Sequence, residues 1–180
     1  MKAPVQIAQL STSESLAVNF FQESVGNWNS QRRYYTLKNG ETQEVESFIR
    51  VSFLEPGSPE LTKLAQLHKF EDETALVGGS QVTWESSYTG KNRKPSQGST
   101  IFGVLGNVLY RDRGFATKNP ITANFYFPNP RTMCLRTEYN GSLFEEELKL
   151  IGTQYRTRQT IISRAGEEVT IGQYLERRID

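Results

Sequence analysis

The sequence predicts an all-β protein: an antiparallel up-and-down barrel of about ten strands, with an N-terminal helix and a second short helix. Three observations predict it. Apolar and polar side chains alternate with a period of two over much of the chain after Gly26. Turn signals such as Asn39-Gly40 and Asn140-Gly141 separate the alternating runs. The runs are short and evenly spaced without an internal repeat, so residues 1–180 are expected to form one domain.

The first segment with a helical period follows a loose lead-in over residues 1–12. Residues 11–24 ("STSESLAVNFFQES") are expected to form a helix, because Ser11 and Glu14 have the spacing of a capping box. Its apolar side chains lie near one stripe, made of Ala17, Phe20, Phe21 and Ser24. Gly26 is expected to end this segment.

Two long alternating runs follow, joined by the turn at Asn39-Gly40. In residues 27–37 ("NWNSQRRYYTL"), one face carries Trp28, Ser30, Arg32 and Tyr34. In residues 44–54 ("EVESFIRVSFL"), one face carries Val45, Ser47, Ile49, Val51 and Phe53. The opposite face of the second run is mostly polar, which indicates a half-buried strand.

The second helix is expected in residues 58–70 ("SPELTKLAQLHKF"). Ser58 is a favourable N-cap and Pro59 a favourable first helical residue. The apolar stripe contains Leu61, Leu64, Ala65 and His68. This pattern predicts a helix of about three turns.

The remaining chain is interpreted as strands and turns. The expected strands are residues 80–88, 99–105, 108–114, 121–127, 131–139, 142–151, 154–163 and 168–179. An open sheet of so many short strands would expose its edges, and closure into a barrel removes them. A barrel of about ten strands can enclose a ligand cavity. We expect the phenylalanine-rich N-terminal helix to cover one end of it.

Composition and charge exclude several classes of protein. The chain has 21 Lys plus Arg against 20 Asp plus Glu, so it lacks the basic excess of a general nucleic-acid binder. No apolar run approaches the roughly 20 residues of a membrane span, and the N-terminus lacks the apolar region of a signal peptide. A single cysteine fits a reducing compartment. These features predict a soluble intracellular domain.

Few isolated side chains suggest chemistry. His68 has no potential ligands at metal-binding spacing, so a packing or surface role is expected and no metal site is predicted. Cys134 has no activating neighbour in sequence, which favours a structural thiol over a nucleophile. The basic loop "KNRKP" (91–95) is interpreted as a solvated tip, with contact to an acidic partner as the alternative.

The run "SLFEEELKL" raises a question about one carboxylate. Glu146 alternates onto the face of Leu148 and Leu150, where an unpaired charge would be costly. The next run carries Arg156 and Arg158 two residues apart, hence on one face. Either the three side chains meet in a cavity, or they form a cross-strand ion pair on the outer surface. The spacing leaves both readings open.

Several motifs taken together resemble the S-type phycobiliprotein lyases, the CpcS/CpeS family. They are "FFQESVGNWNSQRRYY", "VTWESSY" and, above all, "RTEYNG…EEELKL…YRTRQTII". The resemblance extends from about Phe20 to the C-terminus. It implies a ten-stranded calycin barrel, of the lipocalin and fatty-acid-binding-protein kind, with an N-terminal helix.

The resemblance also implies a function. Members of the family are chromophore lyases that attach a phycobilin, a linear tetrapyrrole with two propionates, to a cysteine of a phycobiliprotein subunit through a thioether. The expected substrate is phycocyanobilin or phycoerythrobilin, with no prosthetic group. The expected partners are free phycobilin and an apo-phycobiliprotein subunit, in a cyanobacterial cytoplasm or a plastid stroma. Whether the protein works alone, as a homodimer or as a heterodimer with a paralogue stays open.

The resemblance assigns roles to six residues. Glu146 is the expected catalytic acid near the pyrrole nitrogens, and Arg156 and Arg158 are the expected arginine pair that binds the bilin. The other bilin-binding residues expected are Trp84, Arg32 and Trp28. The chain departs from the family pattern at Tyr34 and Tyr35, where many members have histidines, and in the segment "LKLIGTQ". A non-catalytic bilin carrier or an assembly chaperone on the same barrel is the alternative.

Overall fold

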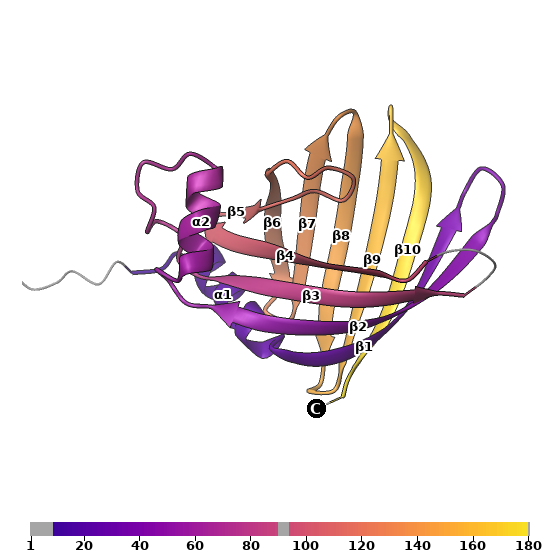
Figure 1. Ribbon diagram of the computed structural model, residues 1–180, viewed down its shortest axis with the longest axis horizontal. Helices are drawn as coiled ribbons and strands as arrows, with labels where there is room; N and C mark the ends of the chain where they lie inside the picture. Colours follow the sequence, from indigo (N-terminus) through magenta and orange to yellow (C-terminus); the bar gives the residue numbers. More distant parts are fainter. Residues whose placement is uncertain (1–8, 90–93, 180) are drawn as a thin grey trace, which may run out of the picture.

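The computed structural model describes residues 9–89 and 94–179, and it confirms a closed antiparallel barrel with two helices (Figure 1). The strands are β1 (Gly26–Thr36), β2 (Thr42–Leu54), β3 (Gly79–Tyr88), β4 (Ser96–Leu105), β5 (Val108–Arg111), β6 (Ile121–Asn129), β7 (Thr132–Tyr139), β8 (Ser142–Ile151), β9 (Tyr155–Arg164) and β10 (Glu167–Arg178). Each strand pairs with its neighbours in sequence, and β1 pairs with β10 to close the sheet.

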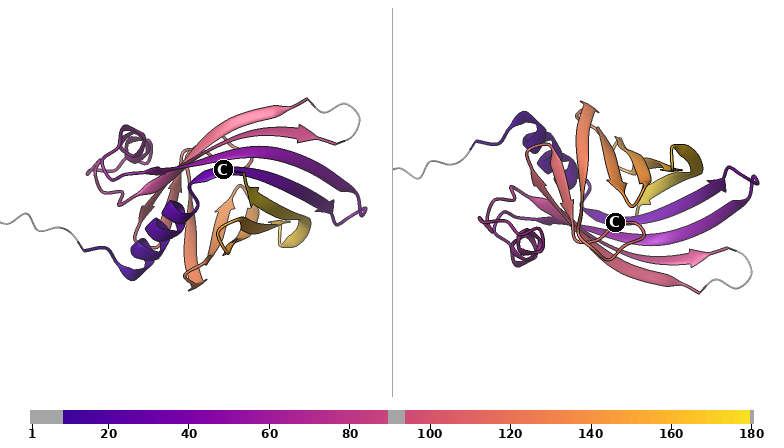
Figure 2. Two further views of the ribbon diagram at one scale, coloured as in Figure 1. Left: turned by 90° about the horizontal axis from the view of Figure 1, so that it is seen from below. Right: turned by 90° about the horizontal axis from the view of Figure 1, so that it is seen from above.

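The barrel is flattened into two facing halves. In Figure 1, strands β1–β4 cross in front of strands β6–β10 at a steep angle, and the views of Figure 2 show the two halves from below and above. The side chains between the halves form the main core, which includes Trp28, Ile49, Val104 and Phe125. The alternation in the sequence therefore separates an inner from an outer face of the barrel.

The first helix, α1 (Thr12–Glu23), begins as the capping-box spacing predicts. Ser11 Oγ accepts a hydrogen bond from the Glu14 backbone N–H at 3.2 Å, and a Glu14 carboxylate oxygen accepts one from the Ser11 N–H at 2.9 Å. The buried stripe of Ala17, Phe20 and Phe21 belongs to the main core, so α1 covers one end of the barrel interior as expected.

The second helix, α2 (Pro59–Leu67), packs on the outer face of the barrel and builds a second core. Ser58 caps it, as predicted. Leu64 lies close to β4 at Gly103, where a Cβ atom would be 2.9 Å from Leu64 Cδ2. A side chain at position 103 would push the helix away, so glycine permits the close contact.

Some boundaries differ from those expected. Strand β4 begins at Ser96, three residues before the expected start, and β5 ends at Arg111 rather than continuing to residue 114. The reason is Asp112, whose carboxylate accepts hydrogen bonds from the Ile101 N–H (3.0 Å) and Thr100 Oγ1 (2.8 Å) and so ends the β5 ladder. Helix α1 starts within the expected lead-in, at Thr12.

Residues 1–8 of that lead-in and 91–93 of the basic loop lie outside the described residues. Within the described ranges, no helix is both long and apolar enough to cross a bilayer.

Candidate ligand-binding site

The barrel contains a cavity of about 560 Å³ between its two halves and α1. This volume lies within the range of small-molecule sites, roughly 300–1,000 Å³. Part of the wall is apolar, with Phe20, Val51, Val82, Phe102, Met133 and Leu148. Another part is polar and charged, with Arg32, Glu146, Arg156, Arg158 and Tyr174. The cavity thus offers an apolar surface beside a group of fixed charges.

Glu146 and Arg158 form an ion pair on the cavity wall, which excludes the outer-surface reading. Glu146 pairs with Thr160 across the β8–β9 ladder and Arg158 with Leu148, so the two side chains meet diagonally. Arg158 Nε donates to Glu146 Oε2 at 3.0 Å, and its Nη2 contacts the same oxygen. Burial alone would lower the pKa of Arg158, but the charge and hydrogen bond of Glu146, together with the charges of Tyr174 and Glu176, outweigh burial and raise it. The guanidinium is therefore fully charged at neutral pH.

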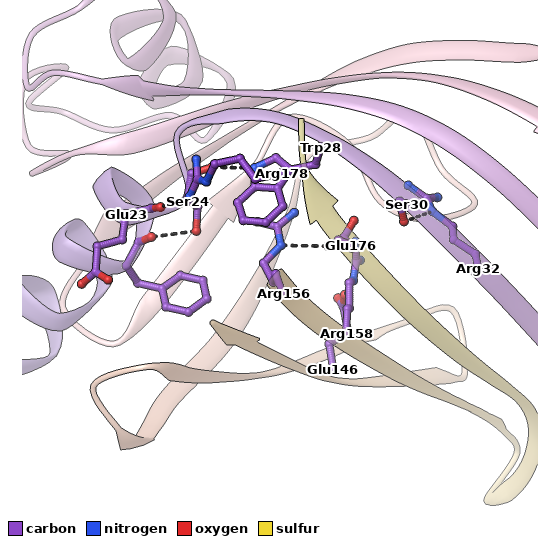
Figure 3. A network of polar contacts seen from close by, with 11 residues as sticks. Glu23, Ser24, Trp28, Ser30, Arg32, Glu146, Arg156, Arg158, Glu176 and Arg178 are labelled. Carbon is purple, nitrogen blue, oxygen red and sulfur yellow. Dashed lines mark hydrogen bonds and ion pairs between the residues drawn. The ribbon is translucent and has the colours of Figure 1, made fainter. Parts of the chain in front are cut away.

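Arg156 has a different partner, Glu176, which the sequence did not predict. The two residues lie directly opposite on β9 and β10, and Arg156 Nε donates to Glu176 Oε1 at 2.8 Å (Figure 3). Burial would raise the pKa of Glu176, but the charges of Arg156, Arg158 and Arg32 and the hydrogen bond from Arg156 together outweigh burial and hold that pKa below its ordinary value. The two arginines are therefore not equivalent, because each is held by its own buried carboxylate.

Trp28 supports this arrangement from outside the cavity wall. Its side chain is fully buried, and its Nε1–H donates to the Ser24 carbonyl at 3.0 Å. The guanidinium carbon of Arg156 lies 5.0 Å from the centre of a Trp28 ring, and that of Arg178 lies 4.2 Å away. Trp28 is not among the residues that line the cavity. The structure thus places Trp28 against Arg156 and Arg178, as Figure 3 shows.

Arg178 links that support to α1. Its Nη2 donates to the Glu23 carbonyl at 2.8 Å, its Nη1 contacts the Val25 carbonyl, and its Nε donates to the Thr153 carbonyl at 2.9 Å. A cation at the C-terminal end of a helix also interacts favourably with the helix dipole. Direct contacts therefore link the end of α1 to Arg178, Arg178 to the ring of Trp28, and Trp28 to Arg156.

Arg32 and Tyr174 complete the polar wall. Tyr174 lies opposite Arg32 on one side and Arg158 on the other, and both guanidinium carbons are close to its ring centre, at 5.2 and 5.1 Å. Tyr174 Oη donates to Tyr34 Oη at 3.1 Å. Burial raises the pKa of Tyr174, so the phenol stays neutral. Tyr34, a departure from the family pattern, thus contributes to the site by orienting Tyr174.

Trp84 lies on the cavity wall, where it was expected. Its indole lies across Gly98, its partner on β4: a Cβ atom at Gly98 would be 2.4 Å from Trp84 Cζ2. A side chain at position 98 would displace the ring, so glycine makes room for the flat indole beside the cavity.

His68 and Cys134 lie away from the cavity lining. His68 Nε2 is 2.9 Å from the Arg111 carbonyl oxygen, and its ring packs on Tyr110. Cys134 is buried on the outward side of β7, and burial raises the pKa of its thiol. Neither side chain therefore has the surroundings of a catalytic group. Among residues 9–89 and 94–179, no cluster of three potential metal ligands occurs.

Glu176, Tyr174 and Arg111 line or support the site without having been singled out from the sequence. A signal for two of them was present. Gly172, Tyr174 and Glu176 alternate along β10, so Glu176 shares a face with a large ring, much as Glu146 shares a face with Leu148 and Leu150. Arg111 alternates with Leu109 onto the more buried face of β5, but a strand of four residues is too short for the period of two to stand out in the sequence.

Comparisons with known proteins agree with this architecture. The family model described as CpeS-like protein matches residues 17–179. A protein of Nostoc sp. (strain PCC 7120) with the provisional name phycocyanobilin lyase CpcS 2 is 66% identical over 166 residues, 92% of each chain. A provisionally named chromophore lyase CpcV of Picosynechococcus sp. (strain PCC 7002) is 51% identical over 171 residues, 94% of this chain and 85% of its own.

A solved structure is similar in fold. The S-type phycobiliprotein lyase CpeS of Guillardia theta superposes with a TM-score of 0.78 at 21% identity, covering 95% of this chain and 99% of its own. At that identity the similarity concerns the barrel and not the details of the site.

The buried pair Arg156–Glu176 is expected to contribute to stability. Glu176→Gln leaves Arg156 buried without its counter-charge, so the free energy of unfolding at pH 7 should fall by about 3–5 kcal/mol, measured by urea denaturation. Because the pKa of Glu176 is lowered in the folded protein, the stabilisation is present above the unfolded pKa of about 4.3 and is lost as the pH falls below it. The difference in unfolding free energy between wild type and Glu176→Gln should therefore become smaller in acid.

The matched control for this measurement is Glu85→Gln, on the exposed face of β3. It should change the unfolding free energy by less than about 0.5 kcal/mol. Equal stabilities of wild type and Glu176→Gln at pH 7 would contradict the assignment of a stabilising pair.

Proposed function

Because the chain belongs to the CpeS-like protein family, we propose that it is a phycobiliprotein chromophore lyase that binds a phycobilin in the barrel and joins it to a cysteine of an apo-phycobiliprotein subunit. The observation that carries the proposal is the ion pair of Glu146 and Arg158 on the wall of a cavity large enough for a small-molecule ligand. Fold alone would not distinguish a lyase from a carrier.

The charged wall supports recognition of a ligand with acidic groups. The bilin carries two propionates, and a guanidinium is a forked donor suited to a carboxylate. Arg158 and Arg32 line the cavity on both sides of Tyr174 and are the side chains that we assign to propionate binding there. Arg156 is directed to Glu176, so we assign it a smaller direct role than its neighbour. Trp28 acts through Arg156, and Trp84 supplies an aromatic wall.

Glu146 is the proposed catalytic group. Both contacts with Arg158 use Oε2, and no hydrogen bond joins Oε1 to a residue of the described ranges, which leaves Oε1 for a pyrrole N–H. A carboxylate there favours the protonated bilin and makes ring A more electrophilic. The acceptor thiol then adds across the ethylidene double bond: its sulfur bonds to carbon and its proton balances the addition. No leaving group or oxidant is required.

The finer assignments concern the bilin, the partner and the compartment. The relative that is 66% identical is named for phycocyanobilin, so phycocyanobilin is the substrate that we propose. The thiol comes from the partner subunit and not from Cys134, which lies away from the cavity lining. We place the reaction in the cyanobacterial cytoplasm or plastid stroma.

The function is tested by mixing the protein, phycocyanobilin and an apo-phycocyanin or apo-allophycocyanin subunit. The expected product is a denaturation-resistant, zinc-fluorescent adduct with the native absorption maximum, formed faster than in a reaction without the protein. Bilin binding without faster attachment would indicate a carrier. Absence of bilin binding would indicate an assembly chaperone.

Arg158→Ala should weaken bilin binding. Loss of one charge-assisted contact costs about 1.5–3 kcal/mol, which corresponds to roughly a ten- to hundredfold higher Kd in an absorbance titration. The control is Arg136→Ala, an exposed arginine on β7 that pairs with Glu138. Circular dichroism checks the fold of both variants. Wild-type affinity in a folded Arg158→Ala protein would remove this residue from the site.

Glu146→Gln should separate binding from chemistry. The amide keeps the shape of the carboxylate but removes its negative charge, so bilin binding persists while the red-shifted absorption of the protonated bilin fades and transfer slows. Absorbance spectra and the transfer assay measure the two effects in one sample. Unchanged transfer by this variant would exclude Glu146 as the catalytic group.

A further inference from the structure

Arg111 is a buried cation that forms no ion pair within the described part of the chain. It lies at the end of β5, is only 8% exposed and lines the cavity. Its Nε is buried without a hydrogen-bond partner, and no carboxylate of residues 9–89 and 94–179 forms an ion pair with it. Arg156 and Arg158, by contrast, each have a buried glutamate. Arg111 therefore differs from the other buried arginines of the barrel.

The neighbourhood of Arg111 compensates its charge only in part. Its guanidinium carbon lies 4.9 Å from the ring centre of Phe102 and 4.7 Å from that of Phe115, which are cation–π contacts. The adjacent Asp112 is directed away, to Thr100 and Ile101. Burial lowers the pKa of Arg111, with Glu146 acting against this effect and Arg158 adding to it. An unpaired buried charge is costly unless something else neutralises it.

Residues 114–118, which follow β5, pack around the Arg111 guanidinium and are held in place by contacts of their own. Phe115 stacks on Phe144 with ring centres 4.5 Å apart, and the Ala116 N–H donates to Tyr139 Oη at 2.9 Å. Residues 114–118 line the cavity together with Arg111. The aromatic cover holds the guanidinium in place, so the group is preorganised for a ligand rather than free to turn to solvent.

We propose that Arg111, on β5, binds a carboxylate of the ligand at a point of the cavity wall separated from Arg158, on β9, by the strands β6, β7 and β8. The inference rests on the proposed function, since it assigns the second propionate of a linear tetrapyrrole to β5 while the first lies against Arg158 and Arg32 on β9 and β1. Two carboxylates held at two separate points of the wall would fix both the depth and the rotation of the tetrapyrrole, which positions ring A.

The test is Arg111→Met, which keeps much of the side-chain volume and removes the charge. The Kd for phycocyanobilin should rise roughly ten- to hundredfold. The ligand-free variant should unfold at a higher urea concentration than wild type, because an unpaired buried charge has been removed. A less stable variant that still binds phycocyanobilin with the wild-type Kd would identify Arg111 as a structural residue and would overturn the proposal. Arg136→Met is the matched control and should bind as wild type does.

The dimethyl ester of phycocyanobilin identifies the group that Arg111 contacts. With the ester, wild type and Arg111→Met should bind with nearly equal affinity, because neither can form the ion pair. An undiminished difference between them would mean that Arg111 does not bind a carboxylate. If Arg111→Met does not fold, Arg111→Lys is measured instead. Lysine keeps the positive charge but lacks the forked pair of N–H donors of a guanidinium. Binding of the free acid should then weaken, while binding of the dimethyl ester should not.

The outcomes separate this inference from the proposed function. Wild-type affinity in the Arg111→Met protein would overturn the assignment of Arg111 and leave the bilin site intact. No binding of phycocyanobilin by the wild-type protein would overturn the proposed function and this assignment with it.

Discussion

The pairing of β1 with β10 is the constraint on which the site depends. It closes the sheet, so that the strands at its two ends have no free edge. It also sets Ser30 opposite Glu176 and Arg32 opposite Tyr174. With the β9–β10 register added, Arg156 and Arg158 extend the same two rows. A shift of one residue in this ladder would turn each of these side chains to the other face.

Burial of charge inside the barrel is the main energetic cost of this arrangement. Glu146 and Glu176 each neutralise one arginine, and each pair has the hydrogen-bond geometry that a buried ion pair needs to offset desolvation. The pairs also hold the guanidinium groups in fixed orientations before a ligand arrives. Arg111 forms no ion pair with a glutamate of the described residues. Its guanidinium instead lies against the rings of Phe102 and Phe115 inside the barrel. An unpaired buried charge destabilises the folded protein. Such charges are typical of functional sites, where a bound ligand can neutralise them.

The tryptophan of the motif "FFQESVGNWNSQRRYY" has a structural explanation in this barrel. Trp28 lies against Arg156 and beside Arg178, and Arg178 in turn binds carbonyl groups at the end of α1. The helix that covers the barrel end and the arginine at the cavity wall are thus coupled through one ring.

The sequence by itself determined the elements and the faces of their side chains. The capping box at Ser11 and the turn at Asn39-Gly40 act over a few residues, and the period of two placed Glu146 on the face of Leu148 and Leu150 and put Arg156 and Arg158 on one face. These signals are local, so they can be recognised without knowing the rest of the chain. The resemblance to the lyase family added the expected function, which no local pattern contains.

Only the tertiary structure decided which inner side chains meet. Arg156 contacts Glu176 rather than Glu146, Trp28 contacts an arginine 150 residues away, and Arg111 lies under a phenylalanine from the following loop. The period of a strand determines the face of a side chain, but its partner depends on strand register, on the diagonal reach of long side chains and on closure of the sheet. Those are properties of all ten strands together. A change of register between any two strands would change which side chains lie opposite one another across that pair.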